Sequence, residues 1–144
     1  MTDSINIVCP QCLVVNRLAT PRLADRPICG KCKQALFNAI PVELDGHSFE
    51  RILARNEIPL MVDFWAPWCG PCKAMALAFK QASASLEPQV RMAKLNTEAE
   101  PEIATRYGIR SIPTMIIFNN GQELRRQSGA MGAAEIINWV QSLK

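Results

Sequence analysis

The sequence has no apolar run close to the ~18 residues that a membrane-spanning helix requires. Its longest apolar stretches, residues 58–66 and 114–118, are interrupted or short and favour buried strands. The N-terminus also lacks a cationic segment followed by an apolar one, which is the pattern of a secretory signal peptide. We therefore expect no signal peptide, no membrane partner and a cytoplasmic location.

Histidine and strong net charge are also scarce. The only histidine, His47, lies far from any catalytic pattern, and we expect a solvated or capping role for it. The formal net charge is +3, and residues 1–40 carry all of it, because residues 41–144 hold eleven basic and eleven acidic side chains. Five basic residues without interleaved aromatics do not indicate nucleic-acid binding, so we expect a solvated surface.

No cysteine stands alone in this chain. All six occur in C-x-x-C pairs, which are Cys9/Cys12, Cys29/Cys32 and Cys69/Cys72. In a reducing compartment such cysteines are more often catalytic or metal-bound than joined in structural disulfides. Because 49% of the residues are hydrophobic, the 144-residue chain can bury a core without crosslinks.

The first four cysteines have the spacing C-x₂-C-x₁₆-C-x₂-C, which is typical of a tetrahedral Cys₄ zinc site. They are Cys9, Cys12, Cys29 and Cys32. The surrounding segment has few large apolar residues, so metal binding would supply most of its folding free energy. Two further redox pairs, a disulfide knot and an iron site of the same geometry remain alternatives. We predict a zinc-ribbon module over residues 1–38.

After a break near residues 38–41, strand and helix patterns alternate. A polar turn at Asn119-Asn120-Gly121 predicts a hairpin, and Ser48 marks a helix N-cap region. We expect strands at 42–44, 59–65, 90–95, 114–118 and 123–127, and helices at 45–56, 69–86, 98–107 (with Gly108 as its C-cap) and 133–143. This alternation predicts an α/β domain over residues 39–144, with a mixed sheet covered by helices on both faces.

The third pair follows a predicted buried strand and opens a predicted helix. Unpaired backbone N–H groups and the helix dipole stabilise a thiolate at that point. We therefore predict that Cys69 is the exposed nucleophile, with a lowered pKa, and that Cys72 is the resolving thiol. A third pair of metal ligands is the alternative, but the other two pairs already complete a tetrahedron.

Asp63 lies inside the apolar strand that leads to this pair. A carboxylate there is costly unless it is paired or neutral. Desolvation should raise its pKa and make it a proton acceptor near neutral pH. The alternative is an aspartate at a strand end that caps a loop.

Residues 62–73, VDFWAPWCGPCK, closely resemble the active-site stretch of thioredoxins. The resemblance continues through residues 94–96 and 107–114, Gly121 and Gly129, and covers nearly all of residues 42–144. It implies the thioredoxin fold and a protein-disulfide reductase. A zinc ribbon ahead of such a domain resembles the bacterial thioredoxin 2 type, in which the metal is structural and, by hypothesis, also senses oxidation.

The resemblance also implies roles for individual residues. Asp63 would take the proton of Cys72, and Lys94 would moderate its charge, although Lys94 could also be a surface strand lysine. Gly70 and Pro71 between the cysteines imply a strongly reducing potential. Pro113 matches the proline of a loop that is cis in the family and pairs with the substrate backbone. An apolar collar would receive the substrate; it consists of Pro67, Trp68, Ile112, Gly129 and Ala130.

Partners and cofactors follow from the same resemblance. A thioredoxin reductase would recharge the protein with electrons from NADPH, so the chain itself would bind Zn²⁺ but no organic cofactor. Ribonucleotide reductase and oxidised cytosolic proteins are the expected substrates, and we expect a monomer. One departure from the family is Leu77, which stands where thioredoxins usually carry a helix-kinking proline. A redox-independent chaperone or binding subunit and a zinc-based redox sensor are the alternative functions.

Overall fold

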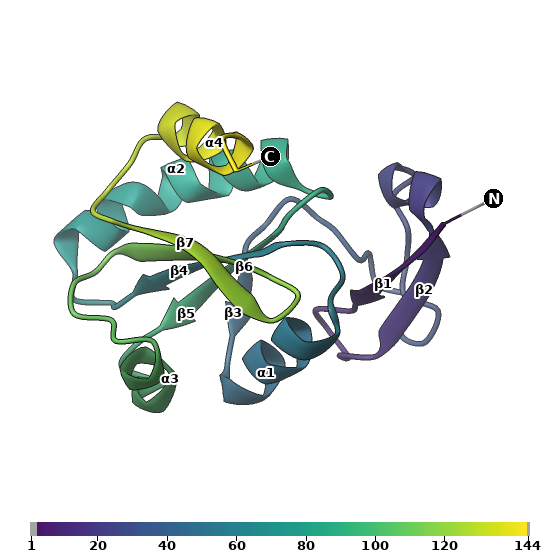
Figure 1. The fold of residues 1–144 in the computed structure, drawn as a ribbon, viewed down its shortest axis with the longest axis horizontal. Coiled ribbons are helices and arrows are strands. Elements are labelled where there is room, and N and C mark those ends of the chain that lie inside the picture. The colour runs from purple at the N-terminus through teal and green to yellow at the C-terminus, as the bar shows by residue number, and fades with distance from the viewer. Residues whose placement is uncertain (1–2, 144) are drawn as a thin grey trace.

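The protein is described here by a computed structural model that covers residues 3–143. Residues 1–2 and 144, the outer ends of the two expected domains, lie outside the described residues. A five-stranded sheet with helices on both faces forms the larger part of the molecule, and a small two-stranded unit lies at one end of it (Figure 1). The predicted α/β architecture is therefore confirmed. No helix within the described residues is long and apolar enough to cross a membrane.

The larger sheet has the strand order β3-β5-β4-β6-β7. Strand β4 lies in its centre, as its continuous apolar sequence predicts. It runs parallel to β5 and antiparallel to β6, and β3 and β7 form the two edges. The strands are β3 (Val42–Leu44), β4 (Leu60–Trp65), β5 (Arg91–Asn96), β6 (Thr114–Asn119) and β7 (Gln122–Ser128).

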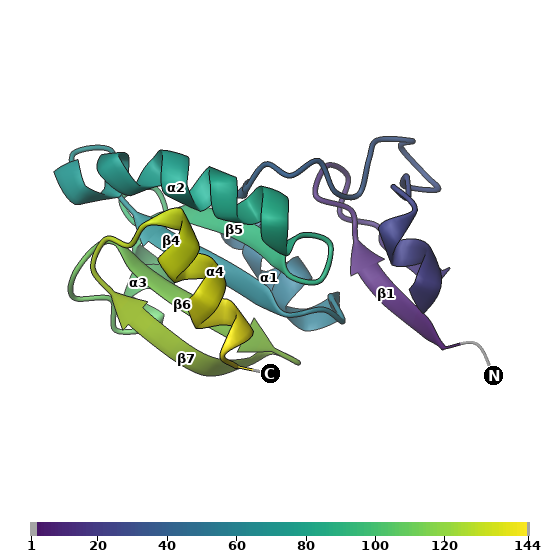
Figure 2. The ribbon, with the colours of Figure 1, turned by 90° about the horizontal axis from the view of Figure 1, so that it is seen from above.

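Four helices cover this sheet, with α2 and α4 on one face and α1 and α3 on the other (Figures 1 and 2). Their bounds are α1 (Gly46–Arg55), α2 (Gly70–Leu86), α3 (Pro101–Arg106) and α4 (Ala133–Gln141). Each face has its own core, because successive side chains of a strand point to opposite faces. In β4, Val62 and Phe64 belong to the core beneath α1, whereas Met61 packs with α2 and α4.

Two helices begin at different residues from those expected. The N-cap of α1 is Asp45 and not Ser48; the Asp45 carboxylate accepts the Ser48 N–H at 2.7 Å, and the Ser48 hydroxyl oxygen accepts the Asp45 N–H at 2.9 Å. Helix α3 starts at Pro101 because Asn96 Oδ1 accepts the N–H groups of residues 98 and 99 and holds that segment in a turn. Gly108 has φ +61° just after α3, as its predicted capping role requires.

The predicted hairpin turn is present between β6 and β7. Asn120 (φ 53°) and Gly121 (φ 78°) have positive φ angles, which a tight two-residue hairpin turn requires. Asn119 itself belongs to β6 and pairs with Gln122. The predicted turn is therefore in the right place, but it consists of Asn120 and Gly121 alone and does not include Asn119.

The N-terminal unit contains strands β1 (Ser4–Val8) and β2 (Val15–Ala19), which pair antiparallel, and a short 3-10 helix, Thr20–Ala24. The sequence pattern predicts no strands here. The strands are short, and their residues are mostly half-buried, so no clean alternation marks them. The pairing is imposed by the turn that carries the first two cysteines.

This unit packs against the end of the sheet where β4 begins (Figure 2). Asn56 and Glu57, which follow α1, meet the outer edge of β1. The Val8 N–H donates to Asn56 Oδ1 at 2.9 Å, and the Glu57 N–H donates to the Asn6 carbonyl oxygen at 2.9 Å. Ile58 completes a small core with Ile7 and other residues of the N-terminal unit.

A buried ion pair strengthens the same junction. Arg91 at the start of β5 contacts Glu87, with 3.2 Å between Nη1 and Oε2, and both side chains are almost fully buried. Arg91 Nη2 donates to the Leu36 carbonyl oxygen, and the guanidinium lies 4.2 Å from the centre of the Phe37 ring. Glu87 in turn accepts the Ala39 N–H at 3.2 Å. Residues 36–39, which link the two units, are thus held in place by the Arg91–Glu87 pair of the larger unit.

Candidate redox and metal centres

The Cys69–Cys72 pair sits where β4 passes into α2, as predicted. The two cysteines form a disulfide. Cys69 is the N-cap residue of α2, and its sulfur accepts the Cys72 N–H at 3.1 Å. Gly70 and Pro71 occupy the first helical positions, where the missing N–H of proline leaves no hydrogen bond unmade. In the reduced protein this N–H and the positive end of the helix would stabilise a Cys69 thiolate.

The expectation of an exposed nucleophile is wrong for this oxidised pair. Cys69 is 4% exposed and Cys72 is 3% exposed, so exposure hardly distinguishes the two. The sulfurs pack with Ala66 and with Trp65 and Ile112. The difference between the two cysteines therefore comes from their position on the helix.

A loop from the other half of the sequence closes over the pair. The Ile112–Pro113 peptide bond is cis, and the Ile112 carbonyl oxygen lies 3.7 Å from Cys69 Sγ. The Gly129 N–H donates to the Pro113 carbonyl oxygen at 2.9 Å, which brings the end of β7 to the same place. Ile112, Pro113 and Gly129 thus meet beside Cys69, although they lie at least 43 residues from it in sequence.

The other expected collar residues are less closely tied to the pair. Trp68 precedes Cys69 and is 66% exposed, so its ring is open to a docking protein. Pro67 is exposed beside it. Ala130 is exposed and follows Gly129, and its place in the collar depends on the resemblance alone.

Asp63 is fully buried in β4, and neither carboxylate oxygen has a hydrogen-bond partner among the described residues. Burial raises the pKa of this carboxyl to about 7, while Lys94 opposes the rise and Glu43 adds to it. The expected high pKa is therefore supported by the burial that the apolar strand indicates. A group with this pKa can accept a proton near neutral pH.

Lys94 lies on β5 directly opposite Asp63 of β4 in the strand register. Its Nζ stands 4.5 Å from the centre of the Trp65 ring, a cation–π contact that fixes the long side chain. Lys94 is half-buried, so part of its side chain is exposed, and its role beside Asp63 stays a prediction. Trp65 packs against the cluster formed by Ala66, Cys69 and Cys72.

The other four cysteines gather at a second centre. Their sulfur atoms all lie within 4.8 Å of one another, and the Cys9–Cys32 and Cys12–Cys29 sulfurs are each 3.6 Å apart. A tetrahedral Zn²⁺ with Zn–S bonds of about 2.3 Å places its sulfurs roughly 3.8 Å apart. None of the four forms a disulfide. The geometry fits a zinc ion and excludes the disulfide knot for this structure.

The two halves of this centre repeat the same turn. The Leu13 N–H donates to the Cys9 carbonyl oxygen and the Lys33 N–H to that of Cys29, and both donors have positive φ (65° and 66°). The Gln11 N–H points at Cys9 Sγ at 3.4 Å, and the Lys31 N–H points at Cys29 Sγ at the same distance. Backbone donors aimed at sulfur favour the thiolate form that a metal requires.

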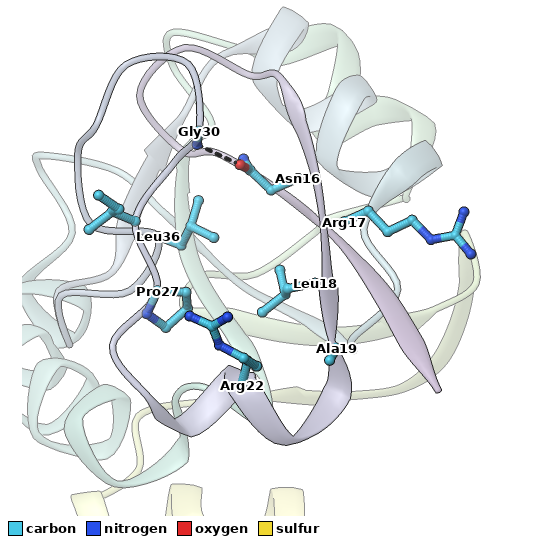
Figure 3. A pocket seen from close by; sticks show the side chains of 9 residues that line it. Asn16, Arg17, Leu18, Ala19, Arg22, Pro27, Gly30 and Leu36 are labelled. Carbon is cyan, nitrogen blue, oxygen red and sulfur yellow. Dashed lines mark hydrogen bonds between the residues drawn. The ribbon is translucent and has the colours of Figure 1, made fainter. Parts of the chain in front are cut away.

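Asn16 on β2 is a further residue of this centre, and the sequence analysis did not single it out. Its Oδ1 accepts the Gly30 N–H at 2.9 Å, drawn as a dashed line in Figure 3, and its Nδ2 lies 3.5 Å from Cys29 Sγ. It thereby ties the first hairpin to the second cysteine turn, beside a surface pocket that Leu36 and Pro27 also line. No sequence signal identifies this asparagine, because its partners lie 13 and 14 residues away.

Comparisons with known proteins agree with both centres. The thioredoxin domain family matches residues 40–142, and the family described as "Thioredoxin 2, N-terminal" matches residues 8–34. Thioredoxin C-3 of Corynebacterium nephridii is 41% identical over 134 residues, which cover 93% of this chain and 92% of the relative. The chloroplastic M-type thioredoxin of Chlamydomonas reinhardtii is 33% identical, covering 90% and 96%.

A solved structure shows the same fold. The crystal structure of chloroplastic thioredoxin z superposes with a TM-score of 0.65 at 27% identity, and it covers 72% of this chain and 93% of its own. The uncovered part of this chain is similar in size to the N-terminal unit.

Proposed function

This chain belongs to the thioredoxin family of thiol-disulfide oxidoreductases, and on that premise we propose that it is a protein-disulfide reductase whose redox centre is the Cys69–Cys72 pair. Cys69 is the N-cap residue of α2 and lies beside the Ile112 carbonyl oxygen. The strand before it holds the buried Asp63, whose carboxylate has no hydrogen-bond partner among the described residues. This arrangement is the observation that most supports the proposal. That combination supplies a thiolate, a surface for a substrate backbone and a base.

The reaction proceeds in two exchanges. In the reduced protein, the Cys69 thiolate attacks one sulfur of the substrate disulfide; a mixed disulfide forms and the other substrate sulfur leaves as a thiolate, which takes up a proton. The Cys72 thiol then gives its proton to Asp63, and its sulfur attacks Cys69 Sγ. This step releases the second substrate thiolate and leaves the Cys69–Cys72 disulfide that the structure contains.

The substrate is proposed to bind along the Pro113 loop. The Ile112 carbonyl and the exposed Trp68 ring flank Cys69, and an extended segment around a substrate disulfide can reach both. By family resemblance, a thioredoxin reductase using NADPH restores the dithiol, and ribonucleotide reductase is among the substrates. We propose that the protein works as a monomer in the cytoplasm.

The second centre is proposed to hold one structural Zn²⁺ through Cys9, Cys12, Cys29 and Cys32. A bound Zn²⁺ would supply the positive charge that keeps four thiolates together. The small core around Ile7 is close to these sulfurs, so metal binding and folding of residues 1–38 are coupled. That oxidation of these thiolates releases the metal and changes activity is a further hypothesis, which zinc release by mild peroxide would test.

The proposed function is tested by insulin reduction with NADPH and a thioredoxin reductase. Cys69→Ser should abolish turnover. Cys72→Ser should accumulate a mixed disulfide with the substrate, because no resolving thiol remains. Retained reduction by Cys69→Ser would disprove the nucleophile assignment. A wild-type protein that reduces nothing would favour the redox-independent binding role.

A further inference from the structure

Three charged side chains form a row across neighbouring strands of the sheet. Glu43 of β3 is the register partner of Lys94 of β5, and Lys94 is the register partner of Asp63 of β4. The residues that flank each of them contribute to the core beneath α1; these are Val42, Leu44, Ala93, Leu95, Val62 and Phe64. Because strand side chains alternate, Glu43, Lys94 and Asp63 all point to the face covered by α2.

The row runs from the buried base to the surface. Asp63 is fully buried, Lys94 is half-buried and Glu43 is exposed at the edge strand. Glu43 and Lys94 line a surface hollow between β3 and α2. The other lining residues are Ile40, Pro41, Ala76, Leu77 and Lys80. The hollow therefore borders the outer end of the row, whereas Asp63 is fully buried.

Lys94 is therefore one cation between two carboxylates. Its contact with the Trp65 ring restricts where the ammonium group can move. No salt bridge joins Lys94 to either acid within residues 3–143, so neither carboxylate holds it alone. Two like charges on either side of one cation oppose each other, and each makes the other harder to ionise.

Other charged groups near Asp63 do not replace Glu43. The antiparallel partner of Asp63 on β6 is Met115, which carries no charge. Helix α2 contributes Cys72 on its buried side, together with Lys80 at the rim of the hollow and Lys73 on the same stripe as Leu77. Glu43 is thus the one other acid in the row.

We propose that Glu43 is a positioning residue of the exchange reaction: it shares the Lys94 ammonium with Asp63 and so keeps Asp63 a base able to take the Cys72 proton near neutral pH. This inference rests on the role of Asp63 in the proposed function. Its consequence is that an exposed residue of the edge strand sets the pH at which the buried base works. Partial desolvation raises the pKa of Glu43, and the charge of Lys94 opposes that rise.

The test is Glu43→Gln, read by the titration of the Asp63 carboxyl carbon by NMR in the reduced protein. Glu43 and Asp63 lie two strand spacings apart, roughly 10 Å. Loss of one negative charge at that range should lower the pKa of Asp63 by roughly 0.5 to 1 pH unit. The acid limb of the pH profile of insulin reduction should also move to lower pH. The plateau rate should fall about twofold to threefold, because Asp63 with a lower pKa is a weaker base.

Glu102→Gln is the matched control, because it removes the same charge from an exposed position on α3, on the other face of the sheet. It should leave the Asp63 titration unchanged. A Glu43→Gln titration that coincides with the wild-type curve, or a Glu102→Gln shift of equal size, would overturn the proposal.

The route through Lys94 is tested in a Lys94→Met background, where only the direct repulsion between Glu43 and Asp63 remains, so Glu43→Gln should shift the Asp63 titration by less than it does in the wild type. An undiminished shift would show that Glu43 does not act by sharing Lys94. The carboxyl titration needs no turnover, so it fails or succeeds independently of the Cys69→Ser assay that tests the proposed function.

Discussion

Asp63, the proposed base of the exchange reaction, is buried at a cost in stability. Its pKa of about 7 in the folded protein is well above the ordinary value of 3.8. Folding therefore favours the protonated form, and the stability that this carboxyl contributes is fully present below pH 4. It is lost as the pH rises through about 7, because the ionised carboxylate has no hydrogen-bond partner among the described residues.

Asp63→Asn should consequently stabilise the protein at pH 8, where the wild type buries a charge and the variant does not. The expected gain in free energy of unfolding is about 2–4 kcal/mol, and it should nearly vanish at pH 4. Urea denaturation at the two pH values measures it. The rate of insulin reduction by this variant should fall by at least about tenfold, because an asparagine amide cannot accept the Cys72 proton as the Asp63 carboxylate is proposed to do. An equal gain at both pH values would show that packing, and not ionisation, is responsible.

Among the single elements, helix α2 matters most, because it carries the Cys69–Cys72 pair at its N-terminal end. Its first turn contains no acidic side chain, so the partial positive charge of the helix end acts on Cys69 without opposition. The helix is continuous from Gly70 to Leu86, which agrees with Leu77 standing where thioredoxins usually carry a helix-kinking proline. Leu77 is 66% exposed, so its side chain does not pack into the core beneath the active site.

Lys73→Glu places a carboxylate in that first turn and should raise the pKa of Cys69 in the reduced protein. A charge at a helix end contributes about 0.3–1 kcal/mol, which corresponds to a shift of roughly 0.2–0.7 pH unit. The rate of iodoacetamide alkylation against pH reports it. Lys80→Glu makes the same change of charge two turns further along α2 and is the control. Equal shifts in both variants would indicate a general charge effect instead of a helix-end effect.

At the scale of the whole molecule, the two centres lie at opposite ends of the sheet. The N-terminal end of α2 points away from the zinc-ribbon unit, and the helix runs toward it (Figure 2). The unit is attached through Asn56, Glu57 and the buried Arg91–Glu87 pair, all of which belong to the larger part. It therefore lies away from the proposed substrate surface around Cys69, with the sheet and α2 between the two centres (Figure 2).

Arg91→Met should weaken this attachment strongly, because it leaves the Glu87 carboxylate buried without its cation and the Leu36 carbonyl without its donor. The expected loss is about 3–5 kcal/mol in the free energy of unfolding. Hydrogen exchange should accelerate at residues 36–39, while the potential of the Cys69–Cys72 pair stays unchanged. The double variant Arg91→Met, Glu87→Met should recover much of the loss. Failure to recover would mean that the charge pair itself is not what matters, and that the packing on Phe37 and the bonds to Leu36 and Ala39, which the double variant also loses, hold the junction.

Features that depend on neighbours along the chain could be predicted from the sequence alone. The strand before Cys69, the helix after it, the hairpin turn at Asn120-Gly121 and the two C-x-x-C turns are all set by local spacing, and all are present. The buried carboxylate of Asp63 could also be foreseen, because an apolar strand on both sides of it leaves no exposed position.

Contacts between distant segments could not be foreseen in this way. The bond of Asn16 to the second cysteine turn and the docking role of Arg91 have no local signal, since Asn16 and Cys29 are 13 residues apart and Arg91 and Leu36 are 55 residues apart. The low exposure of Cys69 results from a loop 43 residues further on. The row of Glu43, Lys94 and Asp63 exists because three strands align in register, and register is set by the packing of both faces and not by any one strand.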